Sequence, residues 1–443
     1  MPHPAVQRRQ PPAEPGFAGQ EAEAVSGVRA LAVIDGEHYP AVVRDALAAL
    51  PYEFAAAWLA GGTEKLREGE EYGVPLVRDL EDGLASYRPE VVVDLSDEPV
   101  LGPRERFVVA SRVLAAGLPY AGPDFRLDPP LLAPFPRPSL GIVGTGKRVG
   151  KTAIAGHVAR LLSTSRRVVV VAMGRGGPSE PEVVAEPPSL EQLLERSRAG
   201  RHAASDHLED AALTAVPAVG ASRCGGGLAG AAARSNVADA AEAALGLDPE
   251  LVVFEGSGAA LPPIATGRRI LVASALQPAL VTAYLNAYRV LVSDLVVAVG
   301  EDGSAIREAV QSLKDVPVVT VLLRPRPVEP VAGRRIAYFC TAPESALEEI
   351  AAHLARKHGA DVAHVSGGLA DRRRLRAELV RVDADVFVTE LKAAAIDVVA
   401  EEAAVRGVPL MLAGNEVVPV DGDLDAAVSE LADAVATEGV IRA

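Results

Sequence analysis

A glycine-rich run between a buried strand pattern and a helix pattern holds the residues best suited to chemistry in this chain. It reads Gly-Thr-Gly-Lys-Arg-Val-Gly-Lys-Thr over residues 144–152, after the apolar residues 140–143 and before the helix pattern 153–162. In such a strand, loop and helix the loop amides and the helix N-terminus point at phosphate groups. We therefore expect Lys151 to reach the β- and γ-phosphates of a nucleotide and the Thr152 hydroxyl to bind Mg²⁺.

The spacing of this loop differs from the usual phosphate-binding loop. Its first glycine is Gly144, one residue earlier than the standard position, which Thr145 occupies. A plain strand-to-helix turn is the alternative, but the flanking strand, the glycines and the long helix favour nucleotide binding. The predicted nucleotide-binding residues here are Gly144, Thr145, Gly146, Val149, Gly150, Lys151, Thr152 and Ala153.

Basic residues beside glycines are expected to supply positive charge to the same site. Arg175 lies in a Gly-Arg-Gly-Gly turn after the strand pattern 167–173, and Arg223 precedes the glycines 225–227. Such turns can bring a guanidinium and bare amides up to an anion, although a flexible linker is the alternative for 225–227. The predicted catalytic residues are Lys147, Arg148, Lys151 and Arg175, and Arg223 and Gly226 are predicted to bind substrate.

Carboxylates of the same segment are candidates for a metal site. Glu255 ends the buried strand pattern 251–255 and is followed by glycines. An acidic residue at that position binds the Mg²⁺ of the nucleotide, directly or through water. We expect Thr152 and Glu255 to be ligands and Asp206 or Asp210 to complete the set, because Mg²⁺ keeps several of its waters.

The N-terminal part carries two further candidates for substrate binding. Asp35 follows the strand pattern 28–34, and His38 comes three residues later. Open parallel sheets place their sites beyond the carboxyl ends of strands, which favours a functional role for Asp35. Helix capping is the alternative for the carboxylate, and a structural role is the alternative for the histidine.

The C-terminal part also places polar residues after strand patterns. Lys392 follows the strand pattern 386–389, and Asn415 follows 409–412. Lys392 could meet a phosphate of the substrate, and Asn415 could read the base of a nucleotide. A surface ion pair and a turn residue, respectively, are the alternatives.

Alternating strand and helix patterns along the chain predict an α/β protein with parallel sheets. Residues 1–27 are expected to form a flexible tail, and 28–126 a smaller N-terminal α/β domain that forms the substrate side of the site or a lid over it. Residues 127–138 form a proline-rich linker, and 139–443 form the nucleotide-binding catalytic domain. The final strands could complete the sheet of that catalytic domain.

Composition narrows the classes of partner. The chain has 443 residues, 49% of them apolar, and a formal net charge of −15. This charge argues against nucleic acid and anionic membranes as partners, and it means that a polyanionic substrate needs a local basic cluster. Two cysteines cannot make a disulfide framework, and no apolar run is long enough for a membrane span or signal peptide, so we expect a cytoplasmic location.

The phosphate loop resembles that of dethiobiotin synthetase, which has the same extra residue, and Glu-Gly-Ser-Gly at 255–258 resembles the Mg²⁺-binding motif of that group. Five stretches in order resemble the cyclic 2,3-diphosphoglycerate synthetase family. They are Ile-Asp-Gly-Glu-His-Tyr-Pro at 34–40, Gly-Thr-Gly-Lys-Arg at 144–148, Ser-Asp-His-Leu-Glu-Asp-Ala at 205–211, Arg-Cys-Gly-Gly-Gly-Leu-Ala-Gly at 223–230 and Thr-Glu-Leu-Lys-Ala-Ala-Ala-Ile-Asp at 389–397. The resemblance implies a P-loop NTPase of the SIMIBI, dethiobiotin synthetase-like type with a smaller N-terminal α/β domain.

This resemblance also implies an activity. The family uses ATP with Mg²⁺ to close a phosphoanhydride between the two phosphates of 2,3-bisphosphoglycerate, releasing ADP and phosphate. The expected assembly is a homodimer. An ATP-dependent carboxylate ligase of the dethiobiotin synthetase kind and a non-catalytic P-loop nucleotide switch are the alternatives.

Overall fold

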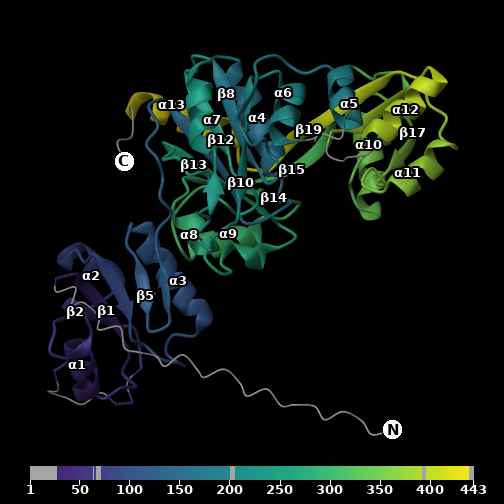
Figure 1. Ribbon diagram of the computed structural model, residues 1–443. Helices are drawn as coiled ribbons and strands as arrows, with labels where there is room; N and C mark the ends of the chain where they lie inside the picture. The colour runs from purple at the N-terminus through teal and green to yellow at the C-terminus, as the bar shows by residue number, and fades with distance from the viewer. Residues whose placement is uncertain (1–26, 63, 66–70, 200–204, 392–395, 439–443) are drawn as a thin grey trace, which may run out of the picture. The chain divides into compact units, whose positions relative to one another are not determined.

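The computed structural model (Figure 1) describes residues 27–438 apart from 63, 66–70, 200–204 and 392–395. The chain divides into two compact units. The first contains the residues up to Val100 together with Ala121–Phe125. The second contains Leu101–Tyr120 and the residues from Arg126 onwards.

The N-terminal sheet has the strand order β3-β2-β1-β4-β5-β6 among the described residues. Its strands are β1 (Arg29–Ile34), β2 (Glu53–Leu59), β3 (Leu76–Val77), β4 (Val91–Asp94), β5 (Tyr120–Gly122) and β6 (Phe125–Leu127). Strand β1 pairs in parallel with both β2 and β4. All four residues of β4 and five of six in β1 are buried, which is the apolar pattern of central parallel strands.

A larger sheet runs through the second unit in the order β11-β10-β8-β12-β7-β13-β14-β15-β19-β18-β16-β17, with β9 added beside β10. Its strands are β7 (Ser139–Gly144), β8 (Val168–Gly174), β9 (Glu182–Val184), β10 (Ala218–Cys224), β11 (Arg234–Ser235), β12 (Leu251–Glu255), β13 (Arg268–Ser274), β14 (Leu295–Val299), β15 (Val318–Pro327), β16 (Arg335–Phe339), β17 (Asp361–Ser366), β18 (Val386–Glu390) and β19 (Leu410–Asp421).

Helices pack against both sheets. They are α1 (Pro40–Ala49), α2 (Leu80–Tyr87), α3 (Pro103–Ala115), α4 (Lys151–Ser163), α5 (Leu190–Arg198), α6 (Asp206–Thr214), α7 (Val237–Leu245), α8 (Asn286–Leu291), α9 (Ser304–Gln311), α10 (Leu347–His358), α11 (Arg372–Leu379), α12 (Ile396–Arg406) and α13 (Leu424–Glu438), with short 3₁₀ turns at Pro278–Val281 and Glu344–Ala346.

The centre of the large sheet positions the phosphate loop. Strands β10, β8, β12, β7 and β13 are mutually parallel, so their carboxyl ends share one edge. Their Val- and Ile-rich sequences are buried on both faces, as crossover helices require. The fold is therefore the predicted α/β P-loop architecture, with the loop at the edge where open sheets bind ligands.

The C-terminal strands extend this sheet rather than forming a separate one. Strand β15 pairs antiparallel with β19, and β18, β16 and β17 follow in parallel. Figure 1 shows the long β15 and β19 running from the phosphate-loop side toward the yellow-green helices α10 to α12. Strand β19 was predicted to end near residue 412, but it continues to Asp421 because β15 supplies a long pairing partner.

The proline-rich segment after β6 packs within the second unit. Ala133 forms a parallel bridge with Ile264, and Phe135 is 4% exposed and packs edge-on against Phe254 at 5.0 Å between ring centroids. The backbone amide of Ala133 also donates to Pro263 O. Among the residues that the structure describes, no helix has both the length and the apolar character that a membrane span requires.

Candidate active site

The phosphate loop connects β7 to α4, and its lysine lies folded against the loop. Lys151 is 8% exposed, and its Nζ donates to Gly146 O at 3.1 Å. A Cβ at Gly144 would lie only 2.8 Å from Lys151 Cδ, so glycine there makes room for the lysine stem. Burial lowers the pKa of Lys151, while the carboxylates of Glu255 and Asp206 oppose that shift. The ammonium thus lies where an incoming phosphate can replace the Gly146 carbonyl.

The backbone of the loop takes an uncommon conformation just before α4. Arg148 has φ 62° and Gly150 has φ 96°, both in the left-handed region. Glycine tolerates this conformation, whereas an arginine there is uncommon and points to a constrained loop. No side chain of the described residues caps the first turn of α4, so its amides face the loop. Lys147 and Arg148 are exposed at the loop surface.

A hydrogen bond between a half-buried threonine and a buried glutamate joins α4 to the end of β12. Thr152 Oγ1 donates to Glu255 Oε1 at 2.8 Å. Glu255 is 1% exposed, and burial raises its pKa to about 8, with Asp206 adding to the rise. The amide of Gly256 donates to Ile142 O at 2.8 Å, which holds the end of β12 beside β7.

This pair fits a hard cation. Glu255 Oε2 is buried and, within the described part of the chain, accepts no hydrogen bond. A buried carboxylate oxygen without a partner is costly, and the carboxylate and hydroxyl oxygens of Glu255 and Thr152 are ligands that Mg²⁺ prefers. Asp206, the first residue of α6, lies near enough to raise the pKa of Glu255. The residues predicted to hold the metal are therefore brought together.

Two arginines meet above the turn that follows β12. A Cβ on Gly258, which has φ 63°, would lie 2.5 Å from Arg175 Nη2 and 3.5 Å from Arg223 Nη2. Arg223 Nη2 donates to Ser257 O at 2.8 Å, and its Nη1 donates to Gly225 O. Burial and then the charge of Arg175 lower the pKa of Arg223. Two guanidiniums this close repel each other, so the geometry favours an anion between or beside them.

Arg289, a buried arginine that was not predicted from the sequence, holds the loops at 228 and 259 through hydrogen bonds to their carbonyl groups. Arg289 is 2% exposed and donates to Ala259 O at 2.8 Å and Leu228 O at 3.1 Å. It also contacts Asn286 Oδ1, and Asn286 Nδ2 donates to Thr145 O at 3.1 Å. Burial lowers the pKa of Arg289 to about 10. The only sign of these contacts in the sequence is that Asn286 and Arg289 are polar residues three positions apart in an apolar helix.

Asn415 lies on β19 beside the first turn of α4. A small cavity joins the two elements, and its lining residues are Thr152, Ala153, Gly156, Arg160, Glu209, Asp210, Leu213, Thr214, Gly414 and Asn415. The structure therefore brings Asn415 close to two predicted nucleotide-binding residues, Thr152 and Ala153. Its predicted contact with a base stays a prediction.

Asp35 and His38 lie in the first unit, at the end of β1. Asp35 Oδ1 accepts from the amides of Glu37 and His38 and lies 2.8 Å from His38 Nδ1, while Oδ2 accepts from Asp97 N at 2.6 Å. These bonds support the structural alternative for the carboxylate, because they use both of its oxygens to hold the loop. A contact of either side chain with substrate stays a prediction.

Two other predicted substrate-binding residues have different outcomes. Gly226 is exposed, and a Cβ there would lie 3.3 Å from Arg223 Nη1. It therefore lies beside the arginine pair. Lys392 lies outside the described residues. His207 of the motif at 205–211 is buried against Gly220, and its Nε2 lies 3.3 Å from Glu182 Oε2, which indicates a packing role.

The two cysteines should differ sharply in reactivity. Cys224 is exposed next to Arg223, whereas Cys340 is fully buried and burial raises its pKa to about 12. Because the thiolate is the reactive form, we expect a thiol reagent to modify Cys224 alone in the native protein. Cys340 should react only after unfolding. Equal reaction of two thiols in the native protein, or a fast thiol remaining in Cys224→Ser, would contradict this prediction.

Comparison with known families covers most of the chain. Models described as the N-terminal, P-loop and C-terminal domains of cyclic 2,3-diphosphoglycerate synthetase match residues 29–128, 139–322 and 327–416. The cyclic 2,3-diphosphoglycerate synthetase of Rubrobacter xylanophilus is 47% identical over 92% of this chain and 98% of that protein. The enzyme of the same name from Pyrococcus abyssi is 41% identical over 91% of this chain and 98% of its own.

A solved structure shows a weaker likeness. It is LpxK from Aquifex aeolicus in complex with ATP, 14% identical over 69% of this chain and 90% of that one, with a TM-score of 0.42. That likeness is too weak to carry an inference about this chain.

Proposed function

Because the chain belongs to the cyclic 2,3-diphosphoglycerate synthetase family, we propose that it uses ATP to join the two phosphates of 2,3-bisphosphoglycerate into a cyclic phosphoanhydride. ADP and inorganic phosphate are the other products. The observation that carries this proposal is that Arg175 and Arg223 lie together beside Gly258 and near Lys151 of the phosphate loop. Burial is the main cause that lowers the pKa of Lys151, and the charges of the two arginines add to it. In a chain with a formal net charge of −15, this local positive charge suits two polyphosphate substrates.

The chemical difficulty of this reaction is repulsion between anions. Both phosphates are already on one small molecule, so proximity is built into the substrate and the enzyme gains little by supplying it. Catalysis should rest on neutralising charge and holding an in-line geometry. A phosphate oxygen is a competent nucleophile, so no strong general base is required.

In the first step, one substrate phosphate attacks the γ-phosphorus of ATP and ADP leaves. Lys151, released from Gly146 O, stabilises the charge on the transferred group, and the loop amides before α4 hold the remaining phosphates. Bound Mg²⁺, which Thr152 and Glu255 would hold with Asp206 nearby, would neutralise charge on the phosphates of ATP.

In the second step, the other substrate phosphate attacks the phosphorus of the activated arm that is bonded to the glycerate oxygen. That bond formation closes the ring, and inorganic phosphate is expelled with the electron pair of the broken anhydride bond. The guanidiniums of Arg175 and Arg223 lie beside Gly258. In this proposal they stabilise the extra negative charge that develops on the phosphate group under attack. The exposed Lys147 and Arg148 contribute charge at the entrance of the loop.

The remaining candidates receive supporting roles in this proposal. Gly226 lets the backbone beside Arg223 approach the substrate, and Asn415 contacts the nucleotide base near Ala153. A contact of Lys392 with a phosphate of the bisphosphoglycerate is part of the same proposal.

Removing Arg175 should impair substrate use more than nucleotide binding. The guanidinium lies with Arg223 over Gly258, so Arg175→Ala should raise the KM for the bisphosphoglycerate by about tenfold or more, the loss of a charge-assisted contact. The dissociation constant of ATP should change little. Arg137→Ala is the matched control, because Arg137 pairs with Asp248 before β7 at the opposite end of the sheet. A collapse of ATP affinity with intact substrate binding would contradict this placement.

The proposed activity can be tested by asking which substrates make the protein release ADP from ATP. With purified protein, Mg²⁺ and ATP, 2,3-bisphosphoglycerate should stimulate ADP release strongly, while 3-phosphoglycerate, which lacks the second phosphate, should not support ring closure. Stimulation by a carboxylate substrate with carbon dioxide would favour a ligase instead. Slow ADP release that only a protein partner accelerates would favour a nucleotide switch.

Assembly, location and partners form the last part of the proposal. We infer a homodimer, as the resemblance to dethiobiotin synthetase-type P-loop proteins implies, and a cytoplasmic location that suits an enzyme consuming ATP. The acidic net charge supports a small-molecule substrate rather than nucleic acid or an anionic membrane surface. Light scattering of the purified protein would test the assembly, since a monomer mass at micromolar concentration would contradict it.

A further inference from the structure

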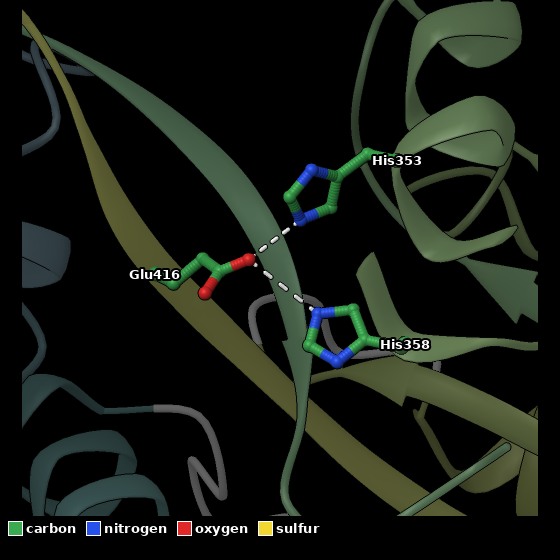
Figure 2. Close-up of side chains that lie close together, drawn as sticks. All are labelled: His353, His358 and Glu416. Atoms are coloured by element: carbon green, nitrogen blue, oxygen red, sulfur yellow. Dashed lines mark hydrogen bonds and ion pairs between the residues drawn. The ribbon is translucent and has the colours of Figure 1, made fainter. Parts of the chain in front are cut away.

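A second cluster of potential ligands lies away from the phosphate loop (Figure 2). His353 and His358 come from the last turns of α10, and Glu416 comes from β19. His353 Nε2 lies 2.6 Å from Glu416 Oε1, and His358 Nε2 lies 3.4 Å from the same oxygen. One ligand atom from each residue lies within 4.8 Å of the other two. Figure 2 shows both imidazoles directed at one carboxylate oxygen.

The cluster is partly shielded from water and its imidazoles are suited to binding a cation. The side chains of His353, His358 and Glu416 are 11%, 19% and 20% exposed. Among the described residues, His358 Nε2 is buried without a well-aligned hydrogen bond.

The separations between Glu416 and the two histidines are close to those between ligands of a zinc ion. Zinc bonds to imidazole nitrogen and carboxylate oxygen are about 2.0–2.2 Å long, so two ligands of a tetrahedral ion lie about 3.3 Å apart. The 3.4 Å from His358 to Glu416 already has this value, and the 2.6 Å from His353 to Glu416 must widen by less than about 1 Å. Rotation of the Glu416 side chain can supply that change.

We propose that His353, His358 and Glu416 bind one Zn²⁺ ion that links the end of α10 to β19. Two imidazoles and one carboxylate leave a fourth tetrahedral position for water. Glu416 follows Asn415, which lines the cavity beside Thr152 and Ala153. The ion therefore stabilises the strand that reaches the phosphate loop, and it takes no part in the phosphate chemistry.

Two arginines near Glu416 offer an alternative explanation for the histidine–carboxylate cluster. Arg324 faces Glu416 across the β15–β19 pair, and Arg160 interacts electrostatically with Glu416. Arg324 Nη2 also lies 3.9 Å from Glu349 Oε1, which offsets part of its charge. Without a metal, Glu416 would serve only as an ion-pair partner of His353 and these arginines. The two explanations predict different results in a metal titration.

The test is titration of Zn²⁺ into the full chain after removal of metal by a chelator, with Mg²⁺ in large excess to occupy the nucleotide site. A chromophoric chelator competes for the ion and reports the affinity. We expect one equivalent of Zn²⁺ to bind, and His358→Gln and Glu416→Gln each to weaken binding by about 100-fold or more. His157→Gln is the matched control, because His157 lies 2.6 Å from Asp425 in a histidine–carboxylate pair that has no third ligand in the described part of the chain.

Cobalt provides a second readout that does not depend on activity. Co²⁺ should give the visible absorption of a four- or five-coordinate site in the unmodified chain and in His157→Gln, and that absorption should vanish in His358→Gln. Zn²⁺ should also raise the Tm of the unmodified chain but not of His358→Gln. Absence of bound Zn²⁺, or equal binding in all variants, would overturn the metal site and leave the ion pair.

Discussion

Replacing Lys151 by alanine is expected to lower turnover by about 10³-fold or more, because the γ-phosphate loses its main counter-charge. The lysine is buried at the start of α4, and among the described residues its ammonium donates only to the carbonyl of Gly146. The ammonium can therefore transfer to phosphate without breaking a contact between distant elements. Phosphoryl transfer involves little covalent chemistry by the protein, which makes charge stabilisation the dominant contribution. The measurement is steady-state ADP release at saturating substrates.

The control for this variant is Lys357→Ala. Lys357 is exposed near the end of α10, so its removal changes the net charge equally without touching the loop. It should keep turnover within about twofold of the unmodified chain, as substitutions at exposed sites usually do. Near-normal turnover in Lys151→Ala would contradict a role of the phosphate loop in the reaction, whatever the control variant shows.

Glu255→Gln is expected to lower turnover without lowering the stability of the fold. The carboxylate is buried, its pKa is raised to about 8 by burial, and Oε2 has no hydrogen-bond donor in the described structure. A neutral amide of the same shape avoids the cost of burying that charge, so Tm should hold or rise. Turnover should fall by about 10²- to 10³-fold, because the amide is a poor ligand for Mg²⁺.

The matched control is Glu250→Gln at the other end of the same strand. Glu250 is half-exposed, and Oε2 accepts from Arg167 N on the side away from the loop. Its loss should leave the Mg²⁺ dependence of turnover unchanged. If Glu255→Gln unfolded the protein or kept the original Mg²⁺ dependence, Glu255 would be a structural carboxylate rather than a metal ligand.

The sequence allowed the central elements to be predicted because local signals and tertiary structure agree there. The run 144–152 combines glycines, a lysine and a hydroxyl in a fixed order, and the structure has β7 and α4 on either side. Glu255 at the end of a buried strand was predictable for the same reason. The Thr152–Glu255 contact then follows from β12 and β7 being neighbours in the sheet.

Other features depend on contacts between distant parts of the chain and leave little trace in sequence. Strand β19 runs through glycine, asparagine and proline residues that disfavour strands, and its pairing with β15 overrides their preferences. Arg289 resembles any surface helix residue until its carbonyl partners are known. His353 and Glu416 are 63 positions apart, so nothing local indicates that they meet.

The most direct test of the proposed reaction is ³¹P NMR of the purified protein with Mg²⁺, ATP and 2,3-bisphosphoglycerate. We predict loss of the two monoester resonances, appearance of an upfield phosphoanhydride pair, and release of ADP and inorganic phosphate in equal amounts. Lys151→Ala should give none of these changes. ATP left intact, or hydrolysed without the upfield pair, would contradict ring closure as the activity of this site.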